Sequence, residues 1–481
     1  MGFSLTIVSA ILGLPFLSAV GLILVPGHRL AARLNILASA LTMIAGFWLV
    51  VDRPATSPLV LIDDFNVYLV ALTVFVGFTT SLFSASYIEH LVDTGELPPL
   101  FLRFYHAMYQ AFMFTMLLAL LANNLGVLWV AVEGATLTTV LMVSLYRTAE
   151  AIEAAWKYFI LCGVGIALAL FGTILVYLAA QPVIGGGMPA MTWSELMVGM
   201  PHVSPDILNL AFVFLLIGYG TKVGLVPLHA WLPDAHAEGP TPISAVLSGL
   251  LLNVAIYAVL RFKMLLTANG GAIAPGPLMV VMGLSSLLVA AFMLYRRRDI
   301  KRLFAYSSIE HMGIITFAFG MGGALANFAG LLHMTMHSLT KSAIFVAVGL
   351  ITQVKGTQKL GEIRGLTTSH PLAGWGLVMG VLAIAGLPPF GIFMSEFLLI
   401  TTTFAREPLL ALPLVLGILI AFGALILRLQ GMAFGEPVGA TGPAASSALP
   451  LFLHLLLVLI AGIWLPGPLV EWFQNVAALL G

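Results

Sequence analysis

Long apolar stretches, separated by short polar or Pro/Gly-rich segments, recur along the whole chain. A helix needs about 20 apolar residues to cross a bilayer, and about fourteen stretches meet that length. The chain is therefore expected to be an all-α, polytopic membrane protein, with residues 1–481 forming a single membrane domain. The predicted spans lie near residues 3–25, 30–51, 65–88, 104–122, 124–146, 154–180, 207–228, 241–264, 275–295, 300–320, 326–352, 371–404, 408–430 and 449–473.

Composition supports the lipid bilayer as the solvent of this chain and narrows its function. Hydrophobic residues make up 60% of the sequence and charged residues only 8%, whereas soluble domains carry about 25% charged residues. Basic and acidic residues cancel, so no basic surface for nucleic acid is expected. The single cysteine, Cys162, excludes an internal disulfide and a cysteine-ligated iron–sulfur cluster on this chain. No flavin, nicotinamide or quinone motif is present, so any redox centre is expected outside this chain.

Lysine and arginine are distributed unequally between alternate loops. Cytoplasmic loops of membrane proteins carry an excess of these residues. The odd-numbered loops hold fourteen and the even-numbered loops four, so we expect the odd loops on the cytoplasmic side and both termini on the outer side of a bacterial or archaeal cytoplasmic membrane. The fourteen are Arg29, Arg33, Arg103, Arg147, Lys157, Arg296, Arg297, Arg298, Lys301, Arg302, Lys355, Lys359, Arg364 and Arg428, and the four are Arg53, Arg261, Lys263 and Arg406.

Two predicted spans carry a similar interruption, Gly224-Leu225-Val226-Pro227 and Gly386-Leu387-Pro388-Pro389. Proline removes a backbone donor and clashes with the preceding turn, so both helices should be broken there. For one proline alone, a packing kink is the alternative. The two breaks lie five spans apart, and an odd offset reverses the direction of crossing. We therefore expect two inverted five-helix repeats, at residues 104–264 and 275–430, with ion sites beside the broken helices.

Charged residues inside spans are the first functional candidates, because a charge at mid-bilayer costs about 2.5–3.5 kcal/mol. Glu133 lies near the middle of the fifth span, and Lys222 immediately precedes the first break. A nearby carboxylate favours the charged lysine and burial disfavours it. We therefore predict a Glu133–Lys222 pair whose contact or separation controls protonation, with a static buried ion pair as the alternative.

In the second half, His333, His337 and Lys341 recur every four residues along one helix face. Histidine can pass protons near neutral pH, although a structural histidine is the alternative for each residue alone. Two histidines at this spacing can also bind a metal, but no third ligand is close in sequence, so no metal site is expected.

Further ionisable residues extend this set. Glu310 and His311 lie inside the tenth span. Glu396 follows the second break toward the outer side, where it is expected to release protons or to be a helix-end charge. The polar cluster after the first break could admit protons or cap a turn, and its members are His229, Asp234, His236 and Glu238.

The run from Gly220 through Gly224 and on from Pro227 to Pro242 (PLHAWLPDAHAEGPTP) resembles the proton-conducting antiporter-like family. That family includes membrane subunits of complex I, Mrp antiporters and energy-converting hydrogenases. The similarity covers about residues 60 to 430. The runs Arg302–Gly313 and Leu387–Gly391 are most similar to the F subunits of hydrogenase-4.

The resemblance implies a proton pathway and partner subunits. It places the family's proton-carrying groups at Glu133, Lys222, His337, Lys341 and Glu396. Many members carry Lys or His in the eighth span, whereas this chain offers Asn253 and Ser248. Waters, or His333 and His337, would then have to bridge the halves. The implied partners are other membrane-arm subunits and a peripheral hydrogenase or iron–sulfur module.

The predicted function is therefore proton translocation within a redox-driven complex, without a redox site on this chain. The alternative is a stand-alone or Mrp-type Na⁺/H⁺ antiporter subunit, or a transporter of a small solute. Central lysines disfavour direct Na⁺ coordination, because an ammonium repels the cation. A lipid-modifying enzyme is disfavoured, since no acidic or nucleophilic cluster lies in an interfacial loop.

Overall fold

The computed structural model describes residues 2–97, 102–439, 444 and 446–481. Within these residues the chain is helical and contains no β-strand, which confirms the all-α prediction. The longer helices are α1 (Gly2–Leu24), α2 (His28–Val51), α3 (Asp64–Asp93), α4 (Leu102–Leu121), α5 (Leu125–Val143), α6 (Ala149–Ile184), α8 (Pro205–Val223), α11 (Leu252–Ala268), α12 (Pro275–Leu294), α13 (Ile300–Met321), α14 (Ala324–Lys355), α16 (Pro371–Ile384), α17 (Gly391–Arg406), α18 (Pro408–Ala433), α19 (Leu449–Ile463) and α20 (Gly467–Leu480). The shorter α-helices are α7 (Trp193–Gly199), α9 (Trp231–Glu238), α10 (Thr241–Val246) and α15 (Leu366–Ser369).

Among the described residues, fewer helices have the length and composition of a membrane span than the fourteen that the sequence predicted. Eleven helices in the described part are long and apolar enough to cross a bilayer, or twelve if α19 and α20 form one span. The count of fourteen is thus not confirmed. The remaining predicted spans correspond to α13, which carries Glu310 and His311, and to the interrupted pair α16 and α17.

The last predicted span, residues 449–473, is not one straight helix. Helix α19 ends at Ile463, and the next helix, α20, lies at an angle of 82° to it. Pro466 separates the two helices, and the residue before a proline is sterically pushed out of the helical conformation. The predicted helix therefore stops about ten residues early.

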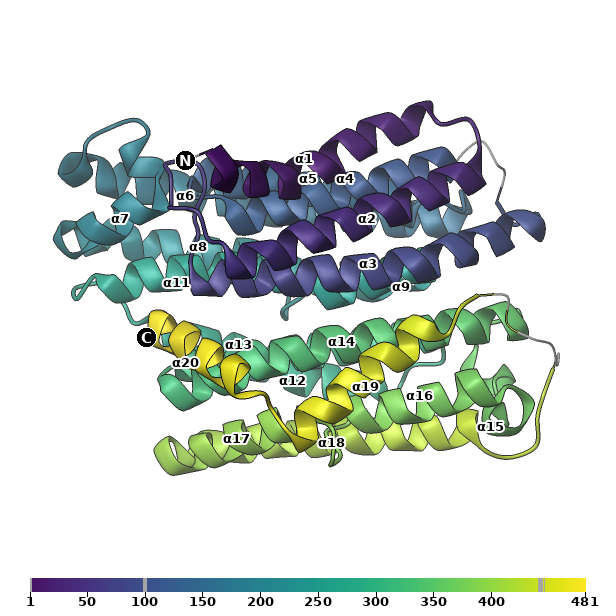
Figure 1. Ribbon diagram of the computed structural model, residues 1–481. Helices are drawn as coiled ribbons and strands as arrows, with labels where there is room; N and C mark the ends of the chain where they lie inside the picture. The colour runs from purple at the N-terminus through teal and green to yellow at the C-terminus, as the bar shows by residue number, and fades with distance from the viewer. Residues whose placement is uncertain (1, 98–101, 440–443, 445) are drawn as a thin grey trace.

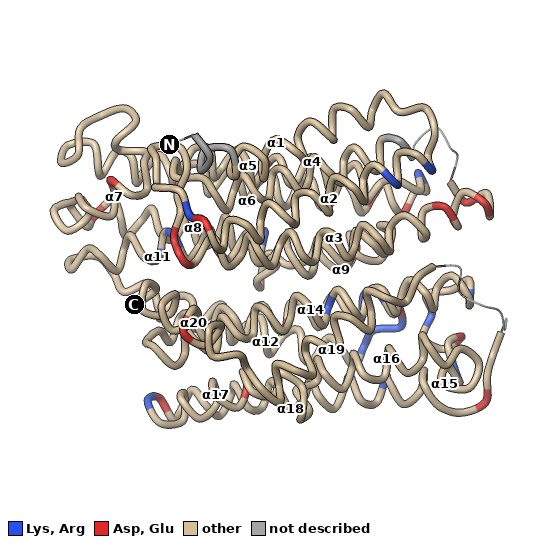
Figure 2. Tube along the Cα trace, in the orientation of Figure 1, with Lys and Arg blue, Asp and Glu red and all other residues tan. Residues whose placement is uncertain are grey.

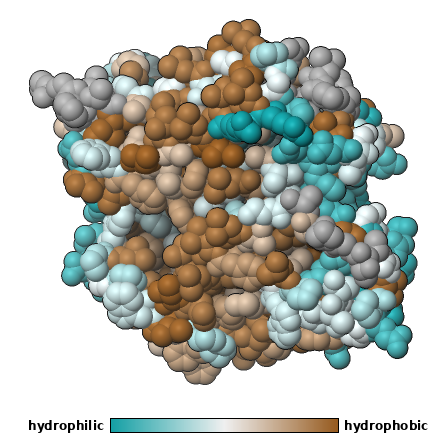
Figure 3. Space-filling model, turned by 45° about the vertical axis from the view of Figure 1, so that its right-hand side comes forward, coloured by the Kyte–Doolittle hydropathy of each residue, from teal (hydrophilic) through white to brown (hydrophobic). Residues whose placement is uncertain are grey.

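The helices lie side by side in two groups, with α1 to α8 in the upper group and α12 to α19 in the lower group of Figure 1. Both termini lie at the same end of the helices (Figure 1). Charged residues gather mainly at the two ends (Figure 2), and apolar side chains cover much of the surface between them (Figure 3). This arrangement is that of a polytopic membrane protein.

Both predicted helix breaks are present. Helix α8 ends at Val223, where Gly224 takes a left-handed φ of +83°, and the chain resumes as α9. The predicted seventh span, 207–228, is thus helical only to Val223. Helix α16 ends at Ile384, Gly386 has φ +69°, and α17 begins at Gly391. A left-handed conformation is tolerated by glycine because it has no Cβ.

Two central segments carry the interior of the molecule. Thr241–Ala268, formed by α10, a π-helical turn at Leu247–Leu251 and α11, is buried throughout its apolar window. Helix α14 is nearly as buried and packs against α13, α16, α17 and α19. Polar side chains on these helices are therefore enclosed by protein rather than by lipid.

Candidate proton relay

Lys222 is fully buried at the end of α8. Its Nζ donates hydrogen bonds to Thr136 Oγ1 on α5 and to Tyr158 OH on α6, each at 2.7 Å. Tyr158 OH in turn lies 2.7 Å from Thr139 Oγ1. The ammonium is thus held by neutral hydroxyl groups from two neighbouring helices.

Trp231, the first residue of α9, covers this site from the far side of the break. Its ring stacks on Tyr158 with centroids 4.6 Å apart, and Lys222 Nζ lies 5.7 Å from its centroid. Its indole Nε1 donates to the carbonyl of Thr221 at 2.8 Å. The indole therefore caps a carbonyl in the last turn of α8, which also accepts a hydrogen bond from the backbone N–H of Gly224 at 3.1 Å.

Glu133 lies near Lys222 but does not form an ion pair with it. Thr136, one turn further along α5, accepts the lysine hydrogen bond instead, and Glu133 Oε2 has no partner. The two charges interact only at longer range. In this conformation a threonine hydroxyl accepts the hydrogen bond from the lysine, so the alternative of a static Glu133–Lys222 ion pair is not seen here. The predicted pair, whose contact or separation controls protonation, stays a prediction.

The second half contains a continuous hydrogen-bonded row. His311 Nδ1 on α13 lies 2.9 Å from His333 Nε2 on α14, and His333 Nδ1 lies 2.9 Å from Ser395 Oγ on α17. Glu310 Oε2 lies 3.6 Å from His311 Nε2. Three helices thus bring together groups that are distant in sequence.

His337 and Lys341 continue the predicted stripe along α14. The His337 ring lies 5.6 Å from the His311 ring, and neither of its nitrogens has a hydrogen-bond partner. Lys341 is fully buried, and its Nζ donates to the carbonyl of Phe304 on α13 at 2.9 Å. His333 and His337 therefore both face His311, while Lys341 contacts α13 about two turns away from His311.

Glu396 lies next to Ser395 on α17 and is 6% exposed. It is close to both imidazoles of the row, since donor atoms of His311, His333 and Glu396 lie within 4.8 Å of one another. The sequence indicated no third metal ligand for the α14 histidines. The fold instead groups only one of them, His333, with His311 of α13 and Glu396 of α17, and this group has the composition of a metal site.

The polar cluster after the first break separates into two parts. Asp234 pairs with Lys157 at 2.5 Å and with Arg302 at 3.3 Å, and Glu238 pairs with Arg302 at 3.2 Å. These carboxylates fasten α9 to α6 and α13. His229 is half-buried, with its ring 6.2 Å from that of Tyr306. These contacts are compatible both with proton entry and with capping of the turn.

His236 stands apart from that cluster. It is fully buried, stacks on Phe345 of α14 with centroids 4.9 Å apart, and has no hydrogen-bond partner on either ring nitrogen. It interacts electrostatically with Lys301 and Lys341. The sequence placed His236 in the cluster that could admit protons or cap a turn, but it could not distinguish this residue from the other members of the cluster.

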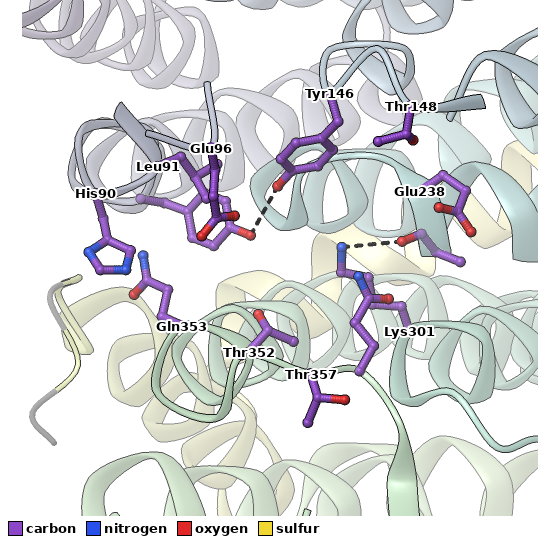
Figure 4. A pocket seen from close by; sticks show the side chains of 14 residues that line it. His90, Leu91, Glu96, Tyr146, Thr148, Glu238, Lys301, Thr352, Gln353 and Thr357 are labelled. Atoms are coloured by element: carbon purple, nitrogen blue, oxygen red, sulfur yellow. Dashed lines mark hydrogen bonds between the residues drawn. The ribbon is translucent and has the colours of Figure 1, made fainter. Parts of the chain in front are cut away.

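A cavity of about 400 Å³ lies at the end of the molecule that holds the odd-numbered loops, and Ala237 and Glu238, which follow His236 in the chain, line part of it. Tyr146, Glu238, Lys301 and Thr352 line it from separate segments (Figure 4). Lys301 Nζ donates to the carbonyl of Gly239 at 2.9 Å. Of the residues that line the cavity, Lys301 interacts electrostatically with the buried imidazole, which does not itself line the cavity.

The eighth predicted span offers no ionisable group at the centre. Asn253 Nδ2 donates to Ser338 Oγ of α14 at 2.6 Å, and Ser248 Oγ lies 2.7 Å from Ser308 Oγ of α13. Asn253 Oδ1 has no protein partner, and buried polar atoms of this kind are commonly bonded by ordered water. The link between the halves therefore consists of hydroxyl and amide groups.

Comparisons with known proteins agree with this architecture. Residues 122–421 match the family described as NADH:quinone oxidoreductase/Mrp antiporter, transmembrane. The chain is 59% identical over 472 residues to the "Hydrogenase-4 component F homolog" of Methylacidiphilum infernorum, covering 98% of this chain and 99% of the relative.

Two solved structures share the fold. One is a chain of an archaeal membrane-bound sulfane sulfur reductase, with a TM-score of 0.87, 21% identity and coverage of 98% of this chain and 97% of that chain. The other belongs to the Mrp complex of Dietzia sp. DQ12-45-1b, with a TM-score of 0.85, 20% identity and coverage of 99% and 97%. With the sequence match, these findings establish that the chain is a member of the NADH:quinone oxidoreductase/Mrp antiporter family of membrane proteins.

Proposed function

We propose that this chain is a proton-translocating, antiporter-like subunit of a redox-driven membrane complex of the hydrogenase-4 type. The near full-length similarity to a hydrogenase-4 component F homolog supports this type. The observation that carries the proposal is the fully buried Lys222, whose hydrogen-bond partners are the neutral hydroxyls of Thr136 and Tyr158. A buried ammonium without an adjacent counter-charge is costly. Such a lysine exchanges its proton readily when its surroundings change.

The proposed pathway runs through both halves. Protons reach Lys222, under the influence of Glu133, in the first half. In the second half they pass along hydrogen-bonded side chains toward Glu396 at the outer side. The cavity that Ala237 and Glu238 line, together with the adjacent His236 in the chain, offers a further route from the cytoplasmic side. The intervening members are His229, Glu310, His311, His333, His337 and Lys341.

Two inverted repeats, residues 104–264 and 275–430, organise this pathway in our proposal. Matching helix neighbours support it, since α6 packs along both α5 and α8, and α14 packs along both α13 and α16. Each proposed repeat contains one broken helix. We further propose that the odd-loop end faces the cytoplasm of a bacterial or archaeal cell, which places both termini outside.

Partner subunits are part of the proposal. The two structural matches come from multi-subunit membrane complexes. The chain exposes apolar residues along its sides, among them Val130, Leu141, Trp156 and Val164. We propose that other membrane-arm subunits cover part of this surface and that a peripheral hydrogenase or iron–sulfur module supplies the driving reaction.

Substitutions of Lys222 test the function. Lys222→Arg keeps the charge permanently, because a guanidinium stays protonated at accessible pH. Lys222→Ala removes the titrating group. Both variants should assemble, as judged on a native gel, yet lose proton uptake per electron in liposomes. The matched control is Lys359→Arg, an exposed lysine, which should pump normally. A fully pumping Lys222→Arg complex contradicts the proposed role.

The Na⁺/H⁺ antiporter alternative is less well supported. The structural likeness to the Mrp chain is at 20% identity and shows the fold alone, whereas the hydrogenase-4 relative matches over nearly the whole chain. Purification from the native membrane distinguishes the two. A redox-driven subunit should copurify with a hydrogenase or iron–sulfur module, and a secondary antiporter should not.

A further inference from the structure

His311, His333 and Glu396 form a compact group of potential metal ligands inside the second half. They come from α13, α14 and α17, are 0%, 1% and 6% exposed, and place one donor atom each within 4.8 Å of the others. We propose that these three side chains bind Zn²⁺, and that the bound metal blocks proton transfer through the relay. The binding stands on this geometry alone, whereas the block rests on the proposed function.

The donor atoms match a borderline transition metal. Two imidazole nitrogens and one carboxylate oxygen form a known set for zinc sites that keep an open position. Na⁺, Mg²⁺ and Ca²⁺ prefer oxygen ligands, so nitrogen donors disfavour them. Zinc–nitrogen bonds of about 2.0–2.1 Å in a tetrahedron put neighbouring donors about 3.3 Å apart. His311 Nδ1 and His333 Nε2 now lie 2.9 Å apart, so a small opening admits the metal.

The second ring nitrogen of His333 already has a hydrogen-bond partner, whereas that of His311 has a carboxylate close by but no hydrogen bond. His333 Nδ1 lies 2.9 Å from Ser395 Oγ, and His311 Nε2 lies 3.6 Å from Glu310 Oε2. Metal-bound histidines usually donate this second N–H to a hydroxyl, carbonyl or carboxylate, which fixes the ring and its tautomer. His311 Nδ1 and His333 Nε2 face each other. These are the two nitrogens that can offer lone pairs to one cation.

Charge balance also favours a divalent cation. Burying an ion is costly unless opposite charges lie close to it. Glu396 would be a direct ligand and Glu310 lies behind His311, so two carboxylates can offset two positive charges. The other ionisable neighbours are His337, whose ring lies 5.6 Å from that of His311, and Lys341, which interacts with Glu310.

The second helix break gives Glu396 its position. A Cβ on Gly386 would lie 2.0 Å from Glu396 Oε2, so only glycine leaves room for the carboxylate there. Glu396 is also the most exposed of the three ligands. The carboxylate therefore lies beside unwound backbone.

Zinc at this position would stop the relay for a simple reason. Proton transfer between His311 and His333 uses the lone pairs and N–H groups along their 2.9 Å contact. A bound metal occupies one lone pair on each ring and one carboxylate oxygen. No proton can then move between the two imidazoles.

The test measures zinc directly in the purified, intact complex. After chelation, incubation with Zn²⁺ and desalting, the metal is counted by elemental mass spectrometry. The wild type should hold one more Zn²⁺ per complex than His333→Gln or Glu396→Gln. His202→Gln, which alters an exposed histidine, is the matched control and should retain the wild-type count.

His333→Cys separates binding from the relay. A thiolate still binds zinc, and X-ray absorption should then show a new zinc–sulfur distance of about 2.3 Å. Assembly of each variant is checked on a native gel. Equal zinc counts in the wild type and both ligand variants, or no sulfur neighbour in His333→Cys, overturn the site. Wild-type pumping that is unchanged by bound zinc overturns the block, while the Lys222 variants test the proposed function independently.

Discussion

Lys222 and Tyr158 contact each other in two ways. The ammonium donates to the phenol oxygen at 2.7 Å and also lies 4.5 Å from the centre of the same ring. Tyr158→Phe keeps the ring and removes the acceptor. A hydrogen bond to a charged group contributes about 1.5–3 kcal/mol, which corresponds to about a 10- to 100-fold change in equilibrium. We expect the charged lysine to be disfavoured by this factor and proton uptake per electron in liposomes to fall.

Tyr177→Phe is the control for that variant, because Tyr177 accepts a hydrogen bond from Gly187 in an exposed loop. It should pump as the wild type does. Equal pumping by Tyr158→Phe and Tyr177→Phe would show that the phenol oxygen does not control Lys222.

Asp63 and Arg261 form an ion pair at the end of the molecule that holds the even-numbered loops. The guanidinium of Arg261, 2% exposed, donates to both Asp63 oxygens at 2.7 and 2.8 Å. Asp63→Asn leaves a buried charge unpaired, which costs about 3–5 kcal/mol. The neighbouring Asp64→Asn breaks only the more exposed pair with Arg53, worth about 0–1 kcal/mol. Thermal unfolding of the two variants should therefore differ clearly, and equal midpoints would contradict the assignment.

The same pair predicts a pH dependence. Burial alone would raise the pKa of Asp63, but the charge and hydrogen bonds of Arg261 outweigh it and hold this pKa below the ordinary value of 3.8. The stabilisation is therefore complete above that value and is lost as the pH falls through the lower pKa of the folded state. Thermal unfolding should be measured between pH 7 and pH 3. The midpoints of the wild type and Asp63→Asn should differ at neutral pH and converge only at the acid end of this range.

Gly386→Ala should damage the second break. The alanine methyl would lie 2.0 Å from Glu396 Oε2, and the backbone φ of +69° is unfavourable for any residue with a Cβ. We expect a loss of about 1–3 kcal/mol in stability and displacement of Glu396. Gly163→Ala, in α6 with nothing near its added methyl, should be neutral or stabilising by up to about 1 kcal/mol. Thermal unfolding of both variants decides between these outcomes.

Membrane orientation can be tested with single cysteines. The native Cys162 is buried, so an introduced cysteine supplies the reactive site. Arg298→Cys, at the odd-loop end, should resist an impermeant reagent added to intact cells, and Arg53→Cys, at the other end, should react. The opposite pattern would reverse the proposed orientation.

The sequence was most informative where a feature is local. Gly and Pro at the two breaks act on their own backbone, and the four-residue spacing of His333 and His337 places both on one helix face. Both features are present as expected. The spacing could not show that His311 would lie between them, since that contact depends on how α13 packs against α14.

Elsewhere the prediction was limited because contacts between different helices cannot be derived from local sequence patterns. Glu133 and Lys222 were paired because both were buried charges, yet Thr136 takes the lysine hydrogen bond. A threonine in a membrane helix carries no signal that distinguishes this role from backbone bonding. Likewise, Ser395 and His236 acquire their significance only from neighbours on other helices.

Helix α9 is fastened at both ends. Trp231 binds the backbone beside Lys222, while Asp234 and Glu238 hold Arg302 of α13, the helix whose Phe304 carbonyl receives Lys341. The side-chain contacts of this short helix therefore connect the residues around Lys222 with the helix that holds Lys341. We expect a displacement at one end of α9 to shift the other end, although no direct contact joins the two lysines.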